Sequence, residues 1–181
     1  MRKLHRWLNH IIPDPQTLRE RRLLRMFGAR VWHPALWHLN RRSVAGGVAA
    51  GLFCGLIPGP LQMLGAAIAA VVLRVNLPVA LLTTLYTNPF TIVPLYLIAY
   101  RLGLLVMPGH AASIPPAPEV SLNLSASFAS LTEWAGALGA PLLAGVPLLG
   151  ALLALCGYFG VRIAWGVYLR LAWRRRARRR G

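Results

Sequence analysis

The sequence has very few acidic residues. Only four of its 181 residues are Asp or Glu, against 20 Lys and Arg, and the formal net charge is +16 at pH 7. No carboxylate falls within the apolar stretches 43–73, 77–108 and 135–161. The chain therefore lacks the intramembrane Asp and Glu residues that relay protons in many pumps.

The sequence also lacks the motifs of common catalytic and metal sites. Its two cysteines, Cys54 and Cys156, lie in separate apolar runs without metal-ligand spacing, and we expect both to be buried free thiols. His33 and His38 flank Pro34 at a spacing that does not suit metal coordination. There is no phosphate-binding loop, no dinucleotide-binding glycine pattern and no G-x-S-x-G elbow. We expect no enzymatic activity, no cofactor and no metal.

Positive charge is concentrated at the two ends of the chain. Ten of the Lys and Arg residues lie in 1–42 and eight lie in 162–180, whereas the 119 residues between carry only Arg74 and Arg101. This distribution is typical of an integral membrane protein whose basic ends fix its topology and touch anionic lipid head groups. The net charge would also suit a nucleic-acid-binding protein, but such a protein needs a polar surface, which the apolar middle does not offer. We expect no specific nucleic-acid partner.

Three long apolar stretches dominate the middle of the chain. The first is broken by Pro-Gly-Pro at 58–60 and the second by Asn-Pro at 88–89. We predict an all-α fold: a polytopic integral membrane protein with proline-broken or re-entrant helices and basic cytoplasmic termini. The predicted parts are a basic cytoplasmic or interfacial amphipathic region (1–42), a membrane domain (43–173) made of a broken hairpin (43–73), an interrupted span (77–108), an external loop (109–133) and a span (135–161), and a basic tail (174–181).

Loop composition and helix length predict the topology. Residues 109–133 contain no Lys or Arg, so we expect them outside and both termini in the cytoplasm. As helices, 43–57 and 61–73 would each be about 20 Å long, too short for a hydrocarbon core of about 30 Å. We expect 43–73 to form a re-entrant hairpin and 77–108 to cross the membrane. In the alternative arrangement, 43–73 crosses as one kinked helix and 77–108 forms the hairpin.

Four glycines recur at four-residue intervals in the first apolar stretch. This spacing is typical of a helix face that packs closely against a neighbour. The Pro-Gly-Pro triplet ends that helix and begins another. The glycines are Gly47, Gly51, Gly55 and Gly59.

The two proline-containing breaks resemble each other. Residues 59–62 (GPLQ) and 88–91 (NPFT) each place a residue that tolerates left-handed backbone before proline, and a polar side chain two residues after it. Short apolar segments interrupted in paired positions point to a transporter site. Helices that begin there aim free N–H groups and a positive dipole end at their surroundings, which attracts an anion such as a phosphate. The repeat is four residues long, and chance resemblance is the alternative.

Other polar residues lie near these breaks. The Thr and Asn residues at 84, 87, 88 and 91 fall at i, i+3, i+4 and i+7, which is one face of a continuous helix. Arg74 is a candidate binding residue or an interfacial loop residue, and Arg101 is a candidate binding residue or a snorkelling side chain. The predicted substrate-binding residues are Gly59, Pro60, Gln62, Arg74, Asn76, Thr84, Thr87, Asn88, Pro89, Thr91 and Arg101.

The chain resembles a family of bacterial inner-membrane domains of unknown function, number two thousand and sixty-two, in the stretches HPALWHLNRRSVAGGVAAGLFCGLIPGPLQM, LRVNLP and TNPFTIVPLYLIAYRLG. The resemblance covers roughly residues 33–165 and implies bacterial origin and multi-pass residence in the inner (cytoplasmic) membrane. It implies no established activity. Similar domains joined to glycosyltransferase domains in some bacteria indicate work on envelope glycans or lipid carriers. The residues that carry the resemblance are Arg41, Arg42, Gly51, Pro58, Gln62, Arg74, Asn76, Pro78, Thr84, Asn88, Pro89, Thr91, Pro94 and Gly103.

These features together predict a small membrane protein that binds or translocates an anionic amphiphile, such as a lipid-linked phosphate. The alternative is a non-transporting scaffold or assembly partner of an envelope enzyme, whose glycine face packs against a partner helix. A solute or ion channel lined by the Thr and Asn face is a third hypothesis. We expect membrane lipids as partners at the basic termini, and a homo-oligomer or an envelope-enzyme complex is compatible with the glycine face.

Overall fold

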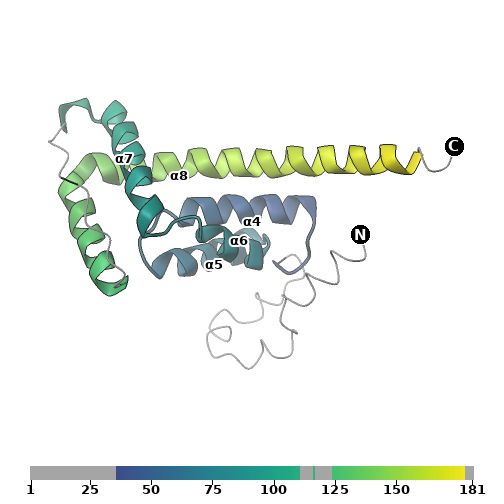
Figure 1. The fold of residues 1–181 in the computed structure, drawn as a ribbon, viewed down its shortest axis with the longest axis horizontal. Coiled ribbons are helices and arrows are strands. Elements are labelled where there is room, and N and C mark those ends of the chain that lie inside the picture. Colours follow the sequence, from purple (N-terminus) through teal and green to yellow (C-terminus); the bar gives the residue numbers. More distant parts are fainter. Residues whose placement is uncertain (1–35, 111–115, 117–123, 178–181) are drawn as a thin grey trace, which may run out of the picture.

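The computed structural model describes residues 36–110, 116 and 124–177 (Figure 1). Within these ranges the chain forms five α-helices and one 3-10 helix and no strand, which confirms the predicted all-α fold class. The predicted amphipathic segment of the N-terminal region lies outside the described residues. The helices are α4 (Arg41–Cys54), α5 (Leu61–Leu73), α6 (Leu77–Thr84), α7 (Pro89–Val106), η3 (Pro108–His110) and α8 (Leu124–Ala177).

A side-chain cap and a glycine fix the ends of α4 and α5. The Asn40 side chain accepts a hydrogen bond from the Ser43 N–H at 2.8 Å, which is an N-cap contact for α4. Between the two helices, Gly59 adopts a φ of 73°, a left-handed conformation that glycine reaches without steric penalty. Pro60 then precedes the first turn of α5, where free N–H groups have no partner in the helix. The chain therefore reverses after α4, and α5 packs back against it.

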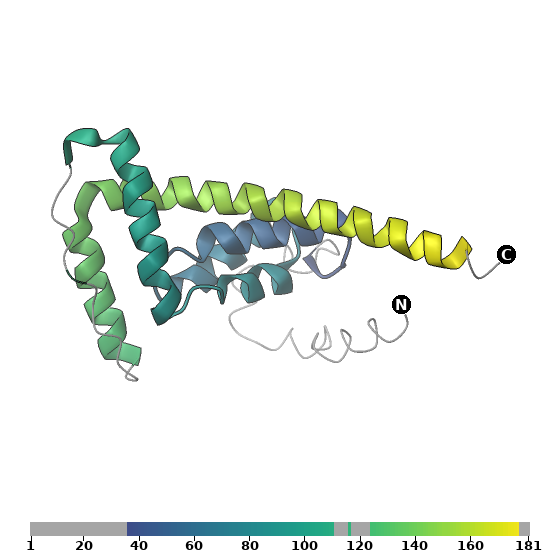
Figure 2. The same cartoon turned by 45° about the horizontal axis from the view of Figure 1, so that its top comes forward.

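Asparagine caps begin α6 and α7. The Asn76 side chain accepts a hydrogen bond from the Val79 N–H at 3.0 Å. Asn88, which caps α7, is extended with φ −139° and ψ 171°, because the residue before a proline is disfavoured in the helical region. α6 lies against α4 and α5, whereas α7 turns away and crosses α8 at a steep angle (Figures 1 and 2). The two parts of the predicted interrupted span thus point in different directions.

The glycine spacing of α4 produces close helix packing, as predicted. A Cβ atom built on Gly47 would lie 2.7 Å from the Asn76 carbonyl oxygen, and one on Gly51 would meet the Ala80 carbonyl oxygen at the next turn. A Cβ on Gly55 would meet the ring of Tyr86. Because these positions carry no side chain, the backbone of α6 rests directly on α4.

A second glycine contact joins α7 to α8, and the sequence analysis did not single it out. A Cβ on Gly145 would meet the Ala99 carbonyl oxygen, and one on Gly103 would meet the Pro141 carbonyl oxygen. The larger side chains around this crossing form a buried cluster. Its buried members are Leu56, Ile92, Tyr96, Ala99, Tyr100, Leu131, Trp134, Leu138, Leu142 and Leu149.

The last helix, α8, bends at Gly139, which has φ 67° and ψ −152°. Pro141 follows the bend and has no N–H to donate to the carbonyl of the preceding turn. The structure differs here from the predicted boundaries. Residues 124–133 of the predicted loop are helical, and the helix continues past 161 into the predicted tail. Within the described residues, Ala129–Leu171 is the one stretch of helix that is long and apolar enough to cross a membrane.

The two thiols differ in exposure. Cys54 is buried, whereas Cys156 is exposed, so the prediction that both are buried is wrong for Cys156. α8 packs on α4 through Gly150 and Gly157, whose Cβ positions face Phe53 and Leu52, and Cys156 lies off that face. Both cysteines are free, as predicted.

The close contact at Gly145 predicts that two Gly→Ala substitutions in α8 have very different effects on the stability of the protein. Gly145→Ala should destabilise the protein by about 1–3 kcal/mol, because the added methyl group meets backbone that cannot move aside. Gly160→Ala is the matched control, because no atom lies within 4 Å of a Cβ built on Gly160. The melting temperature of this variant should equal or exceed that of the unmodified protein. Thermal unfolding of both variants in detergent, followed by circular dichroism, measures the difference. Equal melting temperatures of the two variants would contradict the close backbone contact between α7 and α8 at Gly145.

Candidate functional site

The two predicted breaks meet in the structure through Thr87. Its hydroxyl oxygen lies 2.6 Å from the Gly55 carbonyl oxygen and 2.8 Å from Oε1 of Gln62. The Thr84 carbonyl oxygen is a third acceptor, at 3.0 Å. A hydroxyl has one hydrogen and donates to one of these acceptors at a time. Thr87 therefore bridges the end of α4, the start of α5 and the end of α6.

Hydroxyl groups satisfy the carbonyl end of α4. The last carbonyl groups of a helix have no partner within it. The Tyr86 hydroxyl donates to the Leu52 carbonyl oxygen at 2.8 Å, and the Tyr96 hydroxyl donates to the Leu56 carbonyl oxygen at 2.8 Å. Together with Thr87, these side chains supply the hydrogen bonds that irregular backbone needs in an apolar environment. The polar residues at this break thus have a structural task.

The N-terminus of α7 is closed by its own side chains. Asn88 Oδ1 accepts hydrogen bonds from the N–H groups of Phe90 and Thr91, at 2.9 and 3.0 Å. Thr91 Oγ1 accepts one from the Asn88 N–H at 2.9 Å and donates to the Tyr86 carbonyl oxygen at 2.8 Å. The helix begins at Pro89, which has no N–H to offer. The donors that were expected to face an anion are therefore occupied within the chain.

Asn76 and Thr84, at the two ends of α6, are buried and hydrogen-bonded. The Asn76 side chain caps α6 through Oδ1 and donates from Nδ2 to the His38 carbonyl oxygen at 3.4 Å. The Thr84 hydroxyl donates to the Leu81 carbonyl oxygen at 2.7 Å. Both side chains therefore stabilise helix ends and backbone.

The residues at 84, 87, 88 and 91 would share one face only in a continuous helix, and the helix is not continuous here. α6 ends at Thr84 and α7 begins at Pro89, because Asn88 is held extended before the proline. Thr87 points to the turn after α4, whereas Asn88 is exposed. The four polar residues share no common surface.

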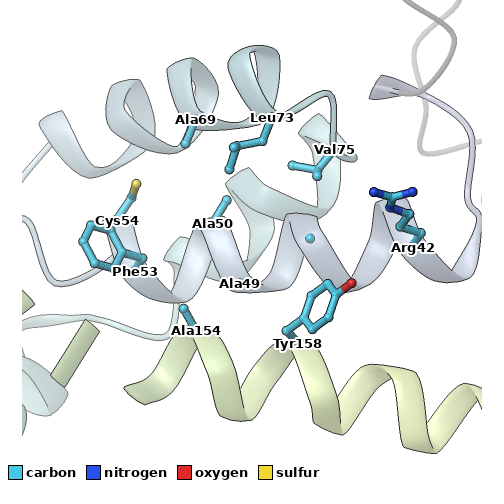
Figure 3. A pocket seen from close by; sticks show the side chains of 11 residues that line it. Arg42, Ala49, Ala50, Phe53, Cys54, Ala69, Leu73, Val75, Ala154 and Tyr158 are labelled. Atoms are coloured by element: carbon cyan, nitrogen blue, oxygen red, sulfur yellow. The ribbon is translucent and has the colours of Figure 1, made fainter. Parts of the chain in front are cut away.

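A groove of about 460 Å³ runs along α4, between α5 and α8 (Figure 3). It exists because the residues facing it are mostly small, so the three helices leave space between them. Phe53 and Leu73 at its edges are 43% and 63% exposed, and the groove is therefore open at the side. Its lining residues are Arg42, Gly46, Ala49, Ala50, Phe53, Cys54, Ala69, Leu73, Val75, Ala154 and Tyr158.

Polar and cationic groups stand at one end of this groove. Figure 3 shows Arg42 and Tyr158 at that end, with Phe53 and Cys54 at the other. The Tyr158 hydroxyl accepts a hydrogen bond from Nη1 of Arg162 at 3.2 Å. The guanidinium carbon of Arg162 also lies 5.5 Å from the centre of the Tyr158 ring, a cation–π distance. The groove is thus apolar along its length and positively charged at the end that carries Arg42 and Tyr158, which we call its mouth.

Arg74 lies at the same end of the groove, and so does Asn76, which is buried, donates its N–H to the Ser43 carbonyl oxygen and does not line the groove. The residues on either side of it, Leu73 and Val75, both line the groove, and Arg74 itself is exposed. Its φ of 54° and ψ of 45° are left-handed. Arg101 is exposed on α7, outside the groove. Gly59 and Pro60 form the turn after α4, beyond the Cys54 end.

The sequence analysis missed Arg42, Tyr158 and Arg162 as candidate site residues. One local signal was present, since Tyr158 and Arg162 are four residues apart and so share a helix face. Their meeting with Arg42 joins positions more than 100 residues apart, and no local pattern encodes it. Among the described residues no group of three or more His, Cys, Asp or Glu could hold a metal ion.

The matched region of a protein-family model runs over residues 24–174, which include every groove residue. The model describes uncharacterised proteins conserved in bacteria, DUF2062. The chain belongs to this family. The resemblance expected from the sequence is thereby confirmed, and DUF2062 carries no assigned activity. No curated protein and no solved structure matches the chain.

The hydrogen bond from the Tyr96 hydroxyl to the Leu56 carbonyl oxygen predicts that this one hydroxyl group contributes to the stability of the protein. Tyr96→Phe should destabilise the protein by about 1–3 kcal/mol, because it leaves the buried Leu56 carbonyl group without its donor. Tyr168→Phe removes the same atom from an exposed side chain and should change little. Urea or thermal unfolding of both variants in detergent measures the effect. Equal stability of the two variants would show that the Tyr96 contact is not formed.

Proposed function

We propose that this chain is a small integral membrane protein that binds an anionic amphiphile, such as a lipid-linked phosphate, in the groove between α4, α5 and α8. The observation that carries the proposal is the distribution of polarity along that groove. From Arg42 to Cys54, α4 provides an apolar bed about 18 Å long that ends beside cationic side chains. An amphiphile has the matching distribution, with an apolar chain and charge at one end.

Residence in a membrane is supported by exposed apolar side chains and by helix length. The uncharged part of α8 between Gly139 and Arg162 would be about 33 Å long, against a hydrocarbon core of about 30 Å. Large exposed apolar residues are unusual in such number on a soluble protein. On α5 and α8 they include Leu61, Leu64, Ile68, Val72, Leu143, Leu152, Leu155, Phe159 and Ile163.

The position of the arginines supports the expected orientation. The first residues of α4 and the last residue before α6 lie at one end of the helices, since the Asn76 N–H donates to the Ser43 carbonyl oxygen at 3.1 Å. Arg42, Arg74 and Arg162 therefore belong to one end, which we assign to the cytoplasmic side of the bacterial inner membrane. In this orientation α4 and α5 form the re-entrant hairpin, and α8 crosses.

The burial of Thr84 and Thr87 favours binding in the groove over a channel lined by polar residues. Both hydroxyls donate to backbone carbonyl groups, and neither lines the groove. A polar pore needs such groups free to replace the hydration of its solute. Binding of an amphiphile therefore agrees better with these contacts than a polar channel does.

Filling the groove should remove the bound lipid. Ala154→Leu places a larger side chain in the groove, and we expect the amount of co-purified anionic lipid to fall several-fold. Ala151→Leu is the matched control, because it adds the same atoms to an exposed position one turn earlier on α8. Mass spectrometry of lipids extracted from both purified variants provides the measurement. Equal lipid content in the two variants would support a scaffold role in place of ligand binding.

Cysteine labelling tests the orientation. In a Cys156→Ser background, Cys54 remains as the buried thiol. A membrane-impermeant maleimide should then label Ala137→Cys in intact cells, because this exposed residue precedes the Gly139 bend at the far end of the span. It should label His38→Cys only after the inner membrane is opened. The reverse pattern would overturn the assignment of the arginine end to the cytoplasm.

A further inference from the structure

We infer that Arg42, Arg74 and Arg162 form a phosphate-binding rim at the mouth of the groove, which selects phosphorylated lipids from the cytoplasmic leaflet. The inference rests on the proposed function, because the groove has to hold the apolar chain of the same molecule. Beyond the proposed function, the inference specifies the chemical class of the lipid head group, the residues that bind this head group and the membrane leaflet that supplies the lipid.

The three arginines reach this end from three different helices. Arg42 is in the first turn of α4 and lines the groove. Arg162 is held against Tyr158, a lining residue, by a hydrogen bond of 3.2 Å and by its position over the ring. Arg74 ends α5 between two lining residues. Guanidinium groups bind phosphate through paired N–H donors, which makes arginine the suitable residue for such a rim.

No carboxylate in this part of the chain neutralises the rim. Residues 36–110 contain no Asp or Glu, and the one acidic residue among those described is Glu133, on α8 before the bend. The first turn of α4 has no acidic residue either, and the positive end of its dipole lies here, beside the negative C-terminal end of α5. Like charges gathered in this way repel each other. A phosphate bound between them offsets that repulsion, as it does in basic pockets between membrane helices on the cytoplasmic side.

The backbone of Arg74 is unusual for an arginine. It is the one residue other than glycine with a positive φ among those described, at φ 54°. Glycine is the preferred residue where a helix ends in this conformation, because a Cβ atom is strained there. A cation at this C-cap also interacts favourably with the negative end of the α5 dipole, which any basic residue would do. A head group at this end of the groove would be a further partner for the guanidinium, and strained residues gather at ligand-binding sites.

Arg74→Gly separates the turn from the binding function. Because glycine suits the left-handed position, this variant should melt at a higher temperature than the unmodified protein. It should nevertheless bind phosphatidic acid about tenfold more weakly, since it loses one charged hydrogen-bonding group. Arg162→Gln should weaken binding to a similar degree, whereas Arg170→Gln, an exposed arginine two turns further along α8, should leave it unchanged. Native mass spectrometry of the full chain with added phosphatidic acid or phosphatidylcholine measures both affinity and preference.

The outcomes distinguish the rim from the groove. The rim is supported if Arg74→Gly and Arg162→Gln lose the preference for phosphatidic acid while Arg170→Gln keeps it. It is refuted if both rim variants keep the preference although Ala154→Leu abolishes lipid binding, and in that case the groove proposal stands. If Ala154→Leu binds phosphatidic acid normally, the groove proposal fails and the rim fails with it. Displacement of phosphatidic acid by inorganic phosphate alone, at the same concentration as the lipid, would refute selection of a lipid.

Discussion

The hydroxyl contacts at the carbonyl end of α4 are the constraint on which the rest of the structure depends. A short helix that stops among apolar side chains leaves acceptors without partners, and leaving them so is costly. Here Tyr86, Thr87 and Tyr96 supply the donors, and all three come from the second apolar stretch. The same contacts therefore end α4, fix the turn before α7 and hold the two stretches together. They stabilise the reversal that Gly59 makes at residues 58–60.

Small residues on two faces of α4 have different consequences. Towards α6, Gly47 and Gly51 allow backbone to touch backbone. Towards α5 and α8, Ala49 and Ala50 face the groove together with the small residues Ala69 and Ala154, and the space is not filled. The close contact between α4 and α6 fixes the position of α4, on whose other side the groove lies. An apolar groove thus follows from one helix whose side chains are small on both sides.

Local features of the fold could be predicted from the sequence, and contacts between distant segments could not. The packing role of Gly47 and Gly51 follows from their spacing, and the interruption before α7, with Asn88 held extended, follows from the proline after it. The helical course of 124–133 was missed, because a stretch without Lys, Arg or clear periodicity was assigned to an external loop. In the site, the sequence pointed to Arg74 but placed the ligand at the breaks. It could not reveal that Arg42 and Tyr158 line one groove, since that depends on how α4 packs against α8.

The crossing of α7 and α8 at Gly103 and Gly145 has a thermodynamic consequence. Its central atoms belong to the backbone, so the two glycines at the contact have no side-chain rotamers to lose when it forms. In the bilayer that we propose for this chain, helices would gain nothing from leaving water, and their association would depend on such dispersion contacts between closely approaching backbones. The angle between the two helices would then be held by shape, with little change between detergent and bilayer.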